Sequence, residues 1–137
     1  MFAIGMALAS ILGGCSGEVS DRDLQTIELA EARRLYASQS TRFVDPRPAE
    51  EFAKGHIKGA LNVKPVQVTE VKTDMEPSIA RAKTVVVYGD NPGTGIARVI
   101  AKRLMVAGHK GVRLYAGGLE EWRANGLPVE GSPPKEQ

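Results

Sequence analysis

The sequence has little of the chemistry that metal sites use. It contains one cysteine, Cys15, and two histidines, His56 and His109, which lie far apart along the chain. A zinc or related site needs several Cys, His, Asp or Glu ligands at short, regular spacings, and no such cluster surrounds either histidine. We therefore expect no metal site and no bound cofactor.

The sequence also lacks a block of charge of one sign. Its 18 Lys and Arg residues and 16 Asp and Glu residues are interspersed, and the formal net charge is +2. The densest basic cluster, Arg98, Lys102 and Arg103, has helical spacing and is typical of a solvated helix face. Nucleic acid is therefore not an expected partner.

A membrane-spanning run is missing as well. Residues 1–12 are apolar, but a helix that crosses a bilayer takes roughly 20 apolar residues, so this segment is too short. Its length is typical of the apolar central region of a secretory signal peptide. It is followed by Leu-Gly-Gly-Cys at residues 12–15, which resembles the bacterial lipobox, in which the cysteine thiol becomes the lipid anchor. A frayed apolar N-terminus with a free thiol at Cys15 is the alternative.

These features predict how the chain is divided. We expect a signal peptide over residues 1–14, a tether over 15–22 that begins at the lipidated Cys15, one domain over 23–130 and a polar tail over 131–137. With 42% hydrophobic residues, the domain has enough apolar material for a single core. The exported protein would lie at the bacterial cell envelope and contact the membrane through its lipid anchor.

Within the domain, strand-like runs alternate with helical patterns. We expect strands within residues 24–27, 41–44, 60–63, 84–88 and 111–115, and helices within residues 29–37, 48–53, 96–107 and 119–124. This alternation predicts a parallel α/β sheet with helices on both faces. The run Thr84–Tyr88 is almost wholly β-branched, as in a central strand that is covered on both sides.

The helical segments carry more specific expectations. Ile96, Val99, Ile100 and Leu104 recur at helical spacing, so this stripe should pack on the sheet, and Trp122 should face the core. The segment from Pro65 to Arg81 is the hardest to interpret. It predicts a helix around residues 68–75 and a break at Pro77.

The turn after the central strand is the candidate ligand site. It reads Gly-Asp-Asn-Pro-Gly-Thr-Gly at residues 89–95 and leads into a helix, whose first N–H groups are unpaired and carry the positive end of the dipole. Such a turn can form an anion-binding cradle from backbone N–H groups. The candidate ligand-binding residues of the turn are Gly89, Asp90, Asn91, Gly93, Thr94 and Gly95. Thr94, the one hydroxyl residue here, is expected to cap the following helix.

Two charged residues at another strand end belong to the same candidate surface. Asp45 and Arg47 follow a predicted strand, and ligands of open α/β sheets bind at the carboxyl ends of the strands. Two interpretations are open: a contribution to ligand binding, or an internal ion pair that holds the loops together, which we favour. His56, in a Gly-His-Ile turn, is expected to hydrogen-bond backbone rather than to act in catalysis.

Several motifs together resemble the rhodanese family. They are Asp-Pro-Arg at 45–47, Gly-His-Ile-Lys-Gly-Ala at 55–60, Val-Val-Tyr at 86–88, Tyr-Ala-Gly-Gly-Leu at 115–119 and Gly-Leu-Pro-Val at 126–129. The resemblance runs from about Ile27 to Glu130. It implies a rhodanese-like α/β fold with a five-stranded, mainly parallel sheet, and a site in the loop after the central strand.

The resemblance also bears on activity. In catalytic members of the family, the residue after the Val-Val-Tyr strand is a cysteine, which takes up a sulfane sulfur as a persulfide and passes it to a thiol or to cyanide. The matching position here is Gly89, which has no side chain. Because the thiolate is the nucleophile of that reaction, the resemblance implies a non-catalytic member with no sulfurtransferase activity by this route.

Three functions follow as hypotheses. The first is a lipid-anchored binding or scaffold module at the cell envelope, whose partner is a small anion or an envelope protein. The second is an enzyme related to the sulfurtransferases, which handles thiosulfate or a persulfide with a thiol that a partner supplies. The third is a structural appendage whose loop binds nothing.

Overall fold

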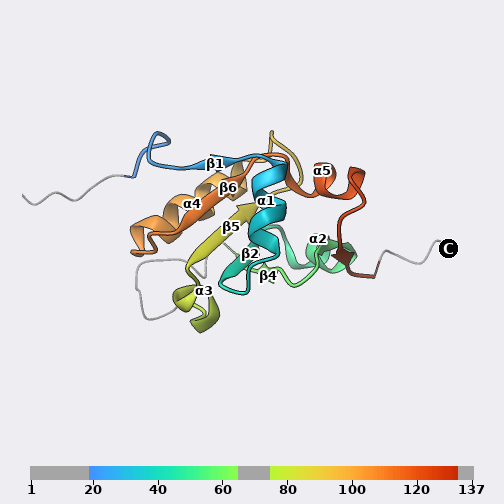
Figure 1. Cartoon of the computed structure of the whole chain (residues 1–137), viewed down its shortest axis with the longest axis horizontal. Helices are drawn as coiled ribbons and strands as arrows, with labels where there is room; N and C mark the ends of the chain where they lie inside the picture. Colours follow the sequence, from blue (N-terminus) through green and yellow to red (C-terminus); the bar gives the residue numbers. More distant parts are fainter. Residues whose placement is uncertain (1–18, 65–74, 133–137) are drawn as a thin grey trace, which may run out of the picture.

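The computed structural model describes residues 19–64 and 75–132 (Figure 1). Its centre is a five-stranded sheet in the order β1-β6-β5-β2-β4, in which every neighbouring pair is parallel. The strands are β1 (Thr26–Ile27), β6 (Val112–Tyr115), β5 (Thr84–Tyr88), β2 (Thr41–Asp45) and β4 (Leu61–Asn62). A separate antiparallel pair joins β3 (His56–Ile57) to β7 (Val129–Glu130). The predicted parallel α/β sheet is confirmed.

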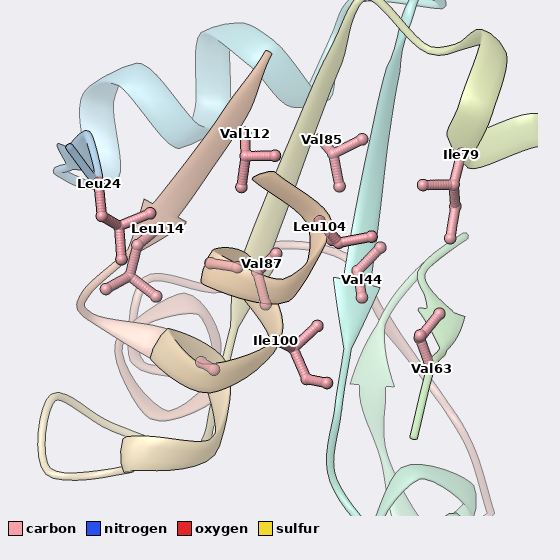
Figure 2. Close-up of a cluster of buried hydrophobic side chains, with 12 residues drawn as sticks. Leu24, Val44, Val63, Ile79, Val85, Val87, Ile100, Leu104, Val112 and Leu114 are labelled. Carbon is pink, nitrogen blue, oxygen red and sulfur yellow. The ribbon is translucent and has the colours of Figure 1, made fainter. Parts of the chain in front are cut away.

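Helices cover both faces of this sheet, as the sequence predicts. On one face lie α3 (Pro77–Arg81) and α4 (Gly95–Val106), which supply Ile79, Ile100 and Leu104 to a buried cluster. Figure 2 shows Ile100 and Leu104 among the strand valines of that cluster. On the other face lie α1 (Leu29–Tyr36), α2 (Ala49–Lys54) and α5 (Gly118–Ala124).

The central strand shows why the sheet needs two layers of helices. Val85 and Val87 belong to the cluster under α4, whereas Val86 and Tyr88 belong to the cluster under α1 and α5. Successive side chains of a strand point to opposite faces, so a strand with apolar side chains on both faces must be covered on both sides. On the α5 side, Trp122 is fully buried, as predicted.

The structure corrects two expectations on the α3 and α4 face. Pro77 begins α3 instead of breaking a helix, because a proline suits the first turn, where its missing N–H needs no partner. The Glu76 carboxylate caps this helix by accepting from the amides of Ser78 and Ile79. Val99 is 41% exposed and lies at the edge of the apolar stripe, not within it. The helix predicted around residues 68–75 falls almost entirely outside the described residues.

The predicted signal peptide and tether remain predictions. The predicted signal peptide and Cys15 lie outside the described residues. At the end of the predicted tether, Asp21 Oδ1 lies 2.7 Å from Lys102 Nζ and 3.9 Å from Arg98 Nη1. The sequence suggested that these two cations of α4 lie on a solvated helix face, but both lie close to the Asp21 carboxylate. None of the helices that the structure describes is long and apolar enough to cross a membrane.

Candidate functional site

The glycine turn lies at the carboxyl end of β5, the central strand. Gly89 follows Tyr88 directly and is buried, and α4 begins at Gly95. The neighbouring strand β2 is parallel to β5 and ends at Asp45, so its carboxyl end lies at the same edge. The fold therefore brings together the two strand ends from which the sequence predicted the site.

Much of the hydrogen-bonding capacity of the turn is used inside the turn. The amide of Gly93 donates to Asn91 Oδ1 over 3.0 Å, and the amide of Thr94 donates to the Asn91 carbonyl over 3.0 Å. The amide of Asn91 itself donates to Thr94 Oγ1 over 3.3 Å. Thr94 therefore does not cap α4 through its side chain, because its oxygen accepts from the turn instead. Of the amides in the predicted cradle, those of Gly95 and Ile96 open α4 and have no acceptor inside their own helix.

Helix α5 fixes the other side of the turn. The amides of Leu119 and Glu120 donate to the carbonyls of Gly89 and Asp90, both over 2.9 Å. Gly118 makes this approach possible: its φ is +68°, and a Cβ there would lie 2.7 Å from both carbonyl oxygens. A residue with a side chain would be strained by its backbone angle and would also collide with the turn.

The space above Gly89 is filled by Thr94. A Cβ placed on Gly89 would lie 2.8 Å from the Thr94 Cβ and 2.9 Å from its Cγ2, closer than real Cβ atoms approach other carbons. A side chain at position 89 could therefore fit only if Thr94 moved. Sequence reasoning did not find this contact, because only the folded turn brings these two positions together.

Arg47 is the most heavily bonded side chain of the site. Its Nη2 donates to Asp45 Oδ2 over 2.8 Å, and its Nε lies 3.0 and 3.2 Å from the two Asp45 oxygens. The same side chain donates to the Gly55 carbonyl over 2.6 Å and to Asp90 Oδ1 over 2.9 Å. Because Asp45 is fully buried and Arg47 is 4% exposed, this is the internal ion pair that the sequence favoured.

The ion pair also controls the proton affinities around it. Burial lowers the pKa of Arg47, but the hydrogen bond and charge of Asp45 and the charge of Asp90 outweigh this effect and raise its pKa overall. Burial raises the pKa of Tyr88 far above its ordinary range, and the Asp45 charge raises it further. The Tyr88 oxygen accepts the amide of Ile57 over 3.0 Å. Tyr88 is therefore a neutral structural phenol, not an acid or base at ordinary pH.

The predicted site residues divide between two hollows. A hollow of about 180 Å³ on the α4 side is lined by the turn, including Gly89, Thr94 and Gly95, and by Arg98. A larger groove of about 570 Å³ lies between α2, α5 and β7, and Arg47 and Asp90 line it. Asp45 lines neither, so its role is to hold Arg47.

The larger groove contains residues that sequence reasoning missed. Its lining includes Glu51 and Lys54 of α2, Leu119 and Arg123 of α5, and Val129 of β7. Glu51 pairs with Lys54 over 2.7 Å. The guanidinium of Arg123 lies against the backbone of Gly55, where a Cβ would be 1.9 Å from its Nη2. Helix α2 is far from α5 and β7 in the sequence, so no local pattern could have indicated that they share a groove.

His56 holds α2 to β7, as a structural residue. Its Nδ1 lies 2.7 Å from the Phe52 carbonyl, and its ring stacks on the Phe52 ring with centroids 3.6 Å apart. This confirms the predicted bond to backbone. Its Nε2 also lies 3.1 Å from Glu130 Oε1, which accepts the Gly59 amide over 2.8 Å. Among the described residues there is no group of three or more His, Cys, Asp or Glu side chains that could hold a metal ion.

The comparisons with known proteins place this parallel α/β domain in a family. Residues 28–125 match the rhodanese-like domain, and the chain belongs to that family. This confirms the resemblance and the fold that it implied.

Two curated proteins and one solved structure are similar to this chain. The chain is 36% identical over 109 residues to human "Thiosulfate:glutathione sulfurtransferase", covering 71% of this chain and 91% of that protein. It is 31% identical over 131 residues to an HTH-type transcriptional regulator of Mycobacterium tuberculosis, covering 95% of this chain but 52% of the regulator. A crystal structure of a Bacillus halodurans protein matches with a TM-score of 0.68 at 24% identity, over 78% of this chain and 77% of that chain, which supports the fold alone.

Proposed function

We propose that this protein is a rhodanese-like binding or scaffold module without sulfurtransferase activity, held at the bacterial cell envelope by a lipid on Cys15. The observation that carries the proposal is the contact between Thr94 and Gly89. In the family, the residue after the central strand supplies the thiolate that attacks the sulfur donor. Here that position has no side chain, and the Thr94 side chain fills the space into which one would project.

The rest of the site supports a binding role. The described residues contain no cysteine. Arg47, which contacts the turn at Asp90, is engaged by Asp45, Asp90 and the Gly55 carbonyl, so it is not free to hold a substrate anion. What the surface offers instead is the groove of about 570 Å³ beside the turn, with Leu119 and Val129 as apolar lining and charged residues around them. A groove of this composition suits a segment of a partner protein better than a small inorganic anion.

A partner bound in this groove is testable with matched variants. The full chain would be used to capture proteins from envelope extracts, together with Arg123→Glu, Val129→Asp and Lys110→Met. We expect one partner that the Lys110→Met control retains and that Arg123→Glu and Val129→Asp lose. Arg123 and Val129 line the groove, whereas Lys110 does not. A partner retained equally by all four proteins would contradict docking at this surface.

Activity assays test the absence of sulfur transfer. The full chain is given thiosulfate with cyanide, and in parallel thiosulfate with glutathione, and the formation of thiocyanate or the release of sulfite is followed. The proposal predicts no turnover above the uncatalysed rate with either acceptor. Turnover with cyanide would overturn it, since that reaction needs an enzyme-bound sulfur carrier.

The second candidate function is an enzyme that uses a thiol from a partner. It is favoured by the likeness to a human protein whose name states transfer from thiosulfate to glutathione. In this reaction, the partner's thiolate attacks the outer sulfur of thiosulfate and forms a new S–S bond. The original S–S bond breaks, and sulfite leaves with its electron pair. The amides of Gly95 and Ile96 would hold the anion. Sulfite release that needs the added thiol and persists in Cys15→Ser would support this function.

A small-anion titration separates binding from the remaining alternative, a structural appendage. Amide shifts of the full chain are followed as thiosulfate, sulfate or phosphate is added. Shifts centred on Gly93–Ile96 would show that the turn takes an anion. No shift there, combined with no partner in the groove, would favour the appendage.

A further inference from the structure

A second hollow lies away from the glycine turn. Thr41, which lines it, is the first residue of β2 and pairs in register with Thr84, the first residue of β5. Because β2 and β5 are parallel and the turn follows the carboxyl end of β5, Thr41 lies at the opposite edge of the sheet from Gly89. This hollow has a volume of about 320 Å³.

Thr41 carries an unpaired buried hydroxyl. The residue is 7% exposed, and its Oγ1 is the one buried side-chain N or O atom among the described residues that has no hydrogen-bond partner. A buried polar group without a partner opposes folding. A valine has nearly the same shape and a higher preference for strands. An acceptor for this hydroxyl therefore has to come from outside the described residues.

The groups around Thr41 decide what that acceptor is. Arg42 and Lys58 are the charged residues of the lining, which contains no carboxylate. The nearby carbonyls are already used: the Tyr36 hydroxyl donates to the Lys58 carbonyl over 3.0 Å, and Arg42 Nη1 donates to the carbonyls of Gln39 and Thr41 over 3.3 and 3.1 Å. Donors are in excess, so the missing partner is an anion with several acceptor oxygens.

The other wall of the hollow is aromatic. It is lined by Tyr36 and Phe43, whose rings meet edge to face with centroids 5.5 Å apart. Phe43 is 4% exposed, so the half-buried Tyr36 ring provides most of the accessible aromatic surface. Glu130 lies outside the lining, where it accepts the amide of the lining residue Gly59 and lies 3.1 Å from His56 Nε2. The bond from the Gly59 amide and the charges of His56 and Lys58 lower the pKa of Glu130, so Lys58 interacts with this carboxylate as well as lining the hollow.

From these observations we propose that the hollow at Thr41 binds a small organic anion, in which a phosphate or similar oxyanion is attached to a flat apolar ring. The oxyanion accepts from the ammonium of Lys58, the guanidinium of Arg42 and the hydroxyl of Thr41. The ring lies against Tyr36. The site is separate from the groove and the glycine turn, so it does not depend on the function proposed for them.

The test compares four variants of the full chain with phenyl phosphate and inorganic phosphate as probes. Thr41→Val removes the hydroxyl, Thr41→Ser keeps it, and Lys58→Met removes the charge but keeps the apolar stem. Lys110→Met is the matched control, because Lys110 is exposed and does not line the hollow. Affinities are measured by calorimetry, amide shifts locate the site, and melting temperatures are recorded without ligand.

We expect phenyl phosphate to bind more tightly than inorganic phosphate and to shift the amides of Ser38, Thr41 and Lys58. Lys58→Met should weaken binding at least tenfold, and Lys110→Met should leave it unchanged. Thr41→Val should weaken binding, while Thr41→Ser retains it. In the absence of ligand, Thr41→Val should raise the melting temperature by about 4 °C, because the unpaired hydroxyl is gone.

Three results would overturn the proposal. An unchanged or lower melting temperature of Thr41→Val would show that the hydroxyl is already satisfied, for example by a bound water. Equal binding by Lys58→Met and Lys110→Met would place the anion elsewhere. Equal affinity for the two probes would show that the aromatic wall does not contribute to binding, which would exclude a ligand with an attached ring.

Discussion

Arg47 donates to both carboxylate oxygens of Asp45, two residues before it, and both side chains are buried. The pair connects the end of β2 with the glycine turn through Asp90 and with the end of α2 through the Gly55 carbonyl. One buried guanidinium therefore holds the segments that border the candidate site.

The first prediction concerns this pair. Arg47→Met should destabilise the fold by about 3–5 kcal/mol, because it leaves the Asp45 carboxylate buried without its counter-ion. The double variant Asp45→Asn, Arg47→Met should recover part of that loss, since no buried charge is then left unpaired. Urea denaturation followed by circular dichroism measures both. A double variant no more stable than Arg47→Met would contradict this account of the pair.

The second prediction concerns the Tyr88 hydroxyl. Tyr88→Phe removes the acceptor of the buried Ile57 amide and should destabilise the fold by about 1–3 kcal/mol. Tyr36→Phe is the matched control, because the Tyr36 hydroxyl donates to a carbonyl at an exposed position. We expect a smaller loss there, of about 0.5–1.5 kcal/mol at most. Equal losses in the two variants would show that the Ile57 amide finds another partner.

The third prediction is an alkaline instability. Burial raises the pKa values of Tyr36, Tyr88 and Tyr115 above the ordinary value of 10.0. The unfolded chain therefore releases these protons first, so the stability should fall as the pH rises above about 10. In a pH titration, the tyrosinate absorbance of Tyr88 should appear only together with the loss of circular dichroism. Its appearance in the folded protein would contradict the predicted shift.

The fourth prediction concerns Cys15, which lies outside the described residues. In a bacterial host, the full chain should incorporate labelled palmitate and sediment with membranes, and Cys15→Ser should do neither. Several acyl chains are needed for stable anchoring, because one chain alone gives only marginal binding. Equal membrane association of the two proteins would show that something other than a lipid on Cys15 holds them there.

The sequence predicted the sheet well for a physical reason. The run at β5 is so uniformly apolar that only a strand covered on both sides can bury it, and the residues after it had to turn because they are rich in glycine. The Asp45–Arg47 pair was also foreseen, since the two residues lie beside each other at a strand end. These signals are local in the chain.

The features that sequence reasoning missed depend on contacts between distant segments. The groove joins α2 to α5 and β7, and Arg123 of α5 approaches the backbone of Gly55 at the end of α2. Pro77 was read as a break because a proline ends helices as readily as it begins them, and the capping carboxylate of Glu76 decides between these outcomes. The unpaired hydroxyl of Thr41 gives no sequence signal at all, because a threonine at the start of a strand is common.

The central claim is that this turn cannot carry sulfur because it has no thiol. The most direct test is to introduce a cysteine at position 89. All proteins carry Cys15→Ser and are given thiosulfate and cyanide. Three are compared: the protein that keeps Gly89, the Gly89→Cys variant, and the double variant Gly89→Cys, Thr94→Ala. Gly93→Cys is the control for a thiol elsewhere in the turn. We expect thiocyanate formation to be highest in the double variant, because Thr94 no longer collides with the new side chain, and to be absent from the protein that keeps Gly89. Turnover by that cysteine-free protein would contradict the account.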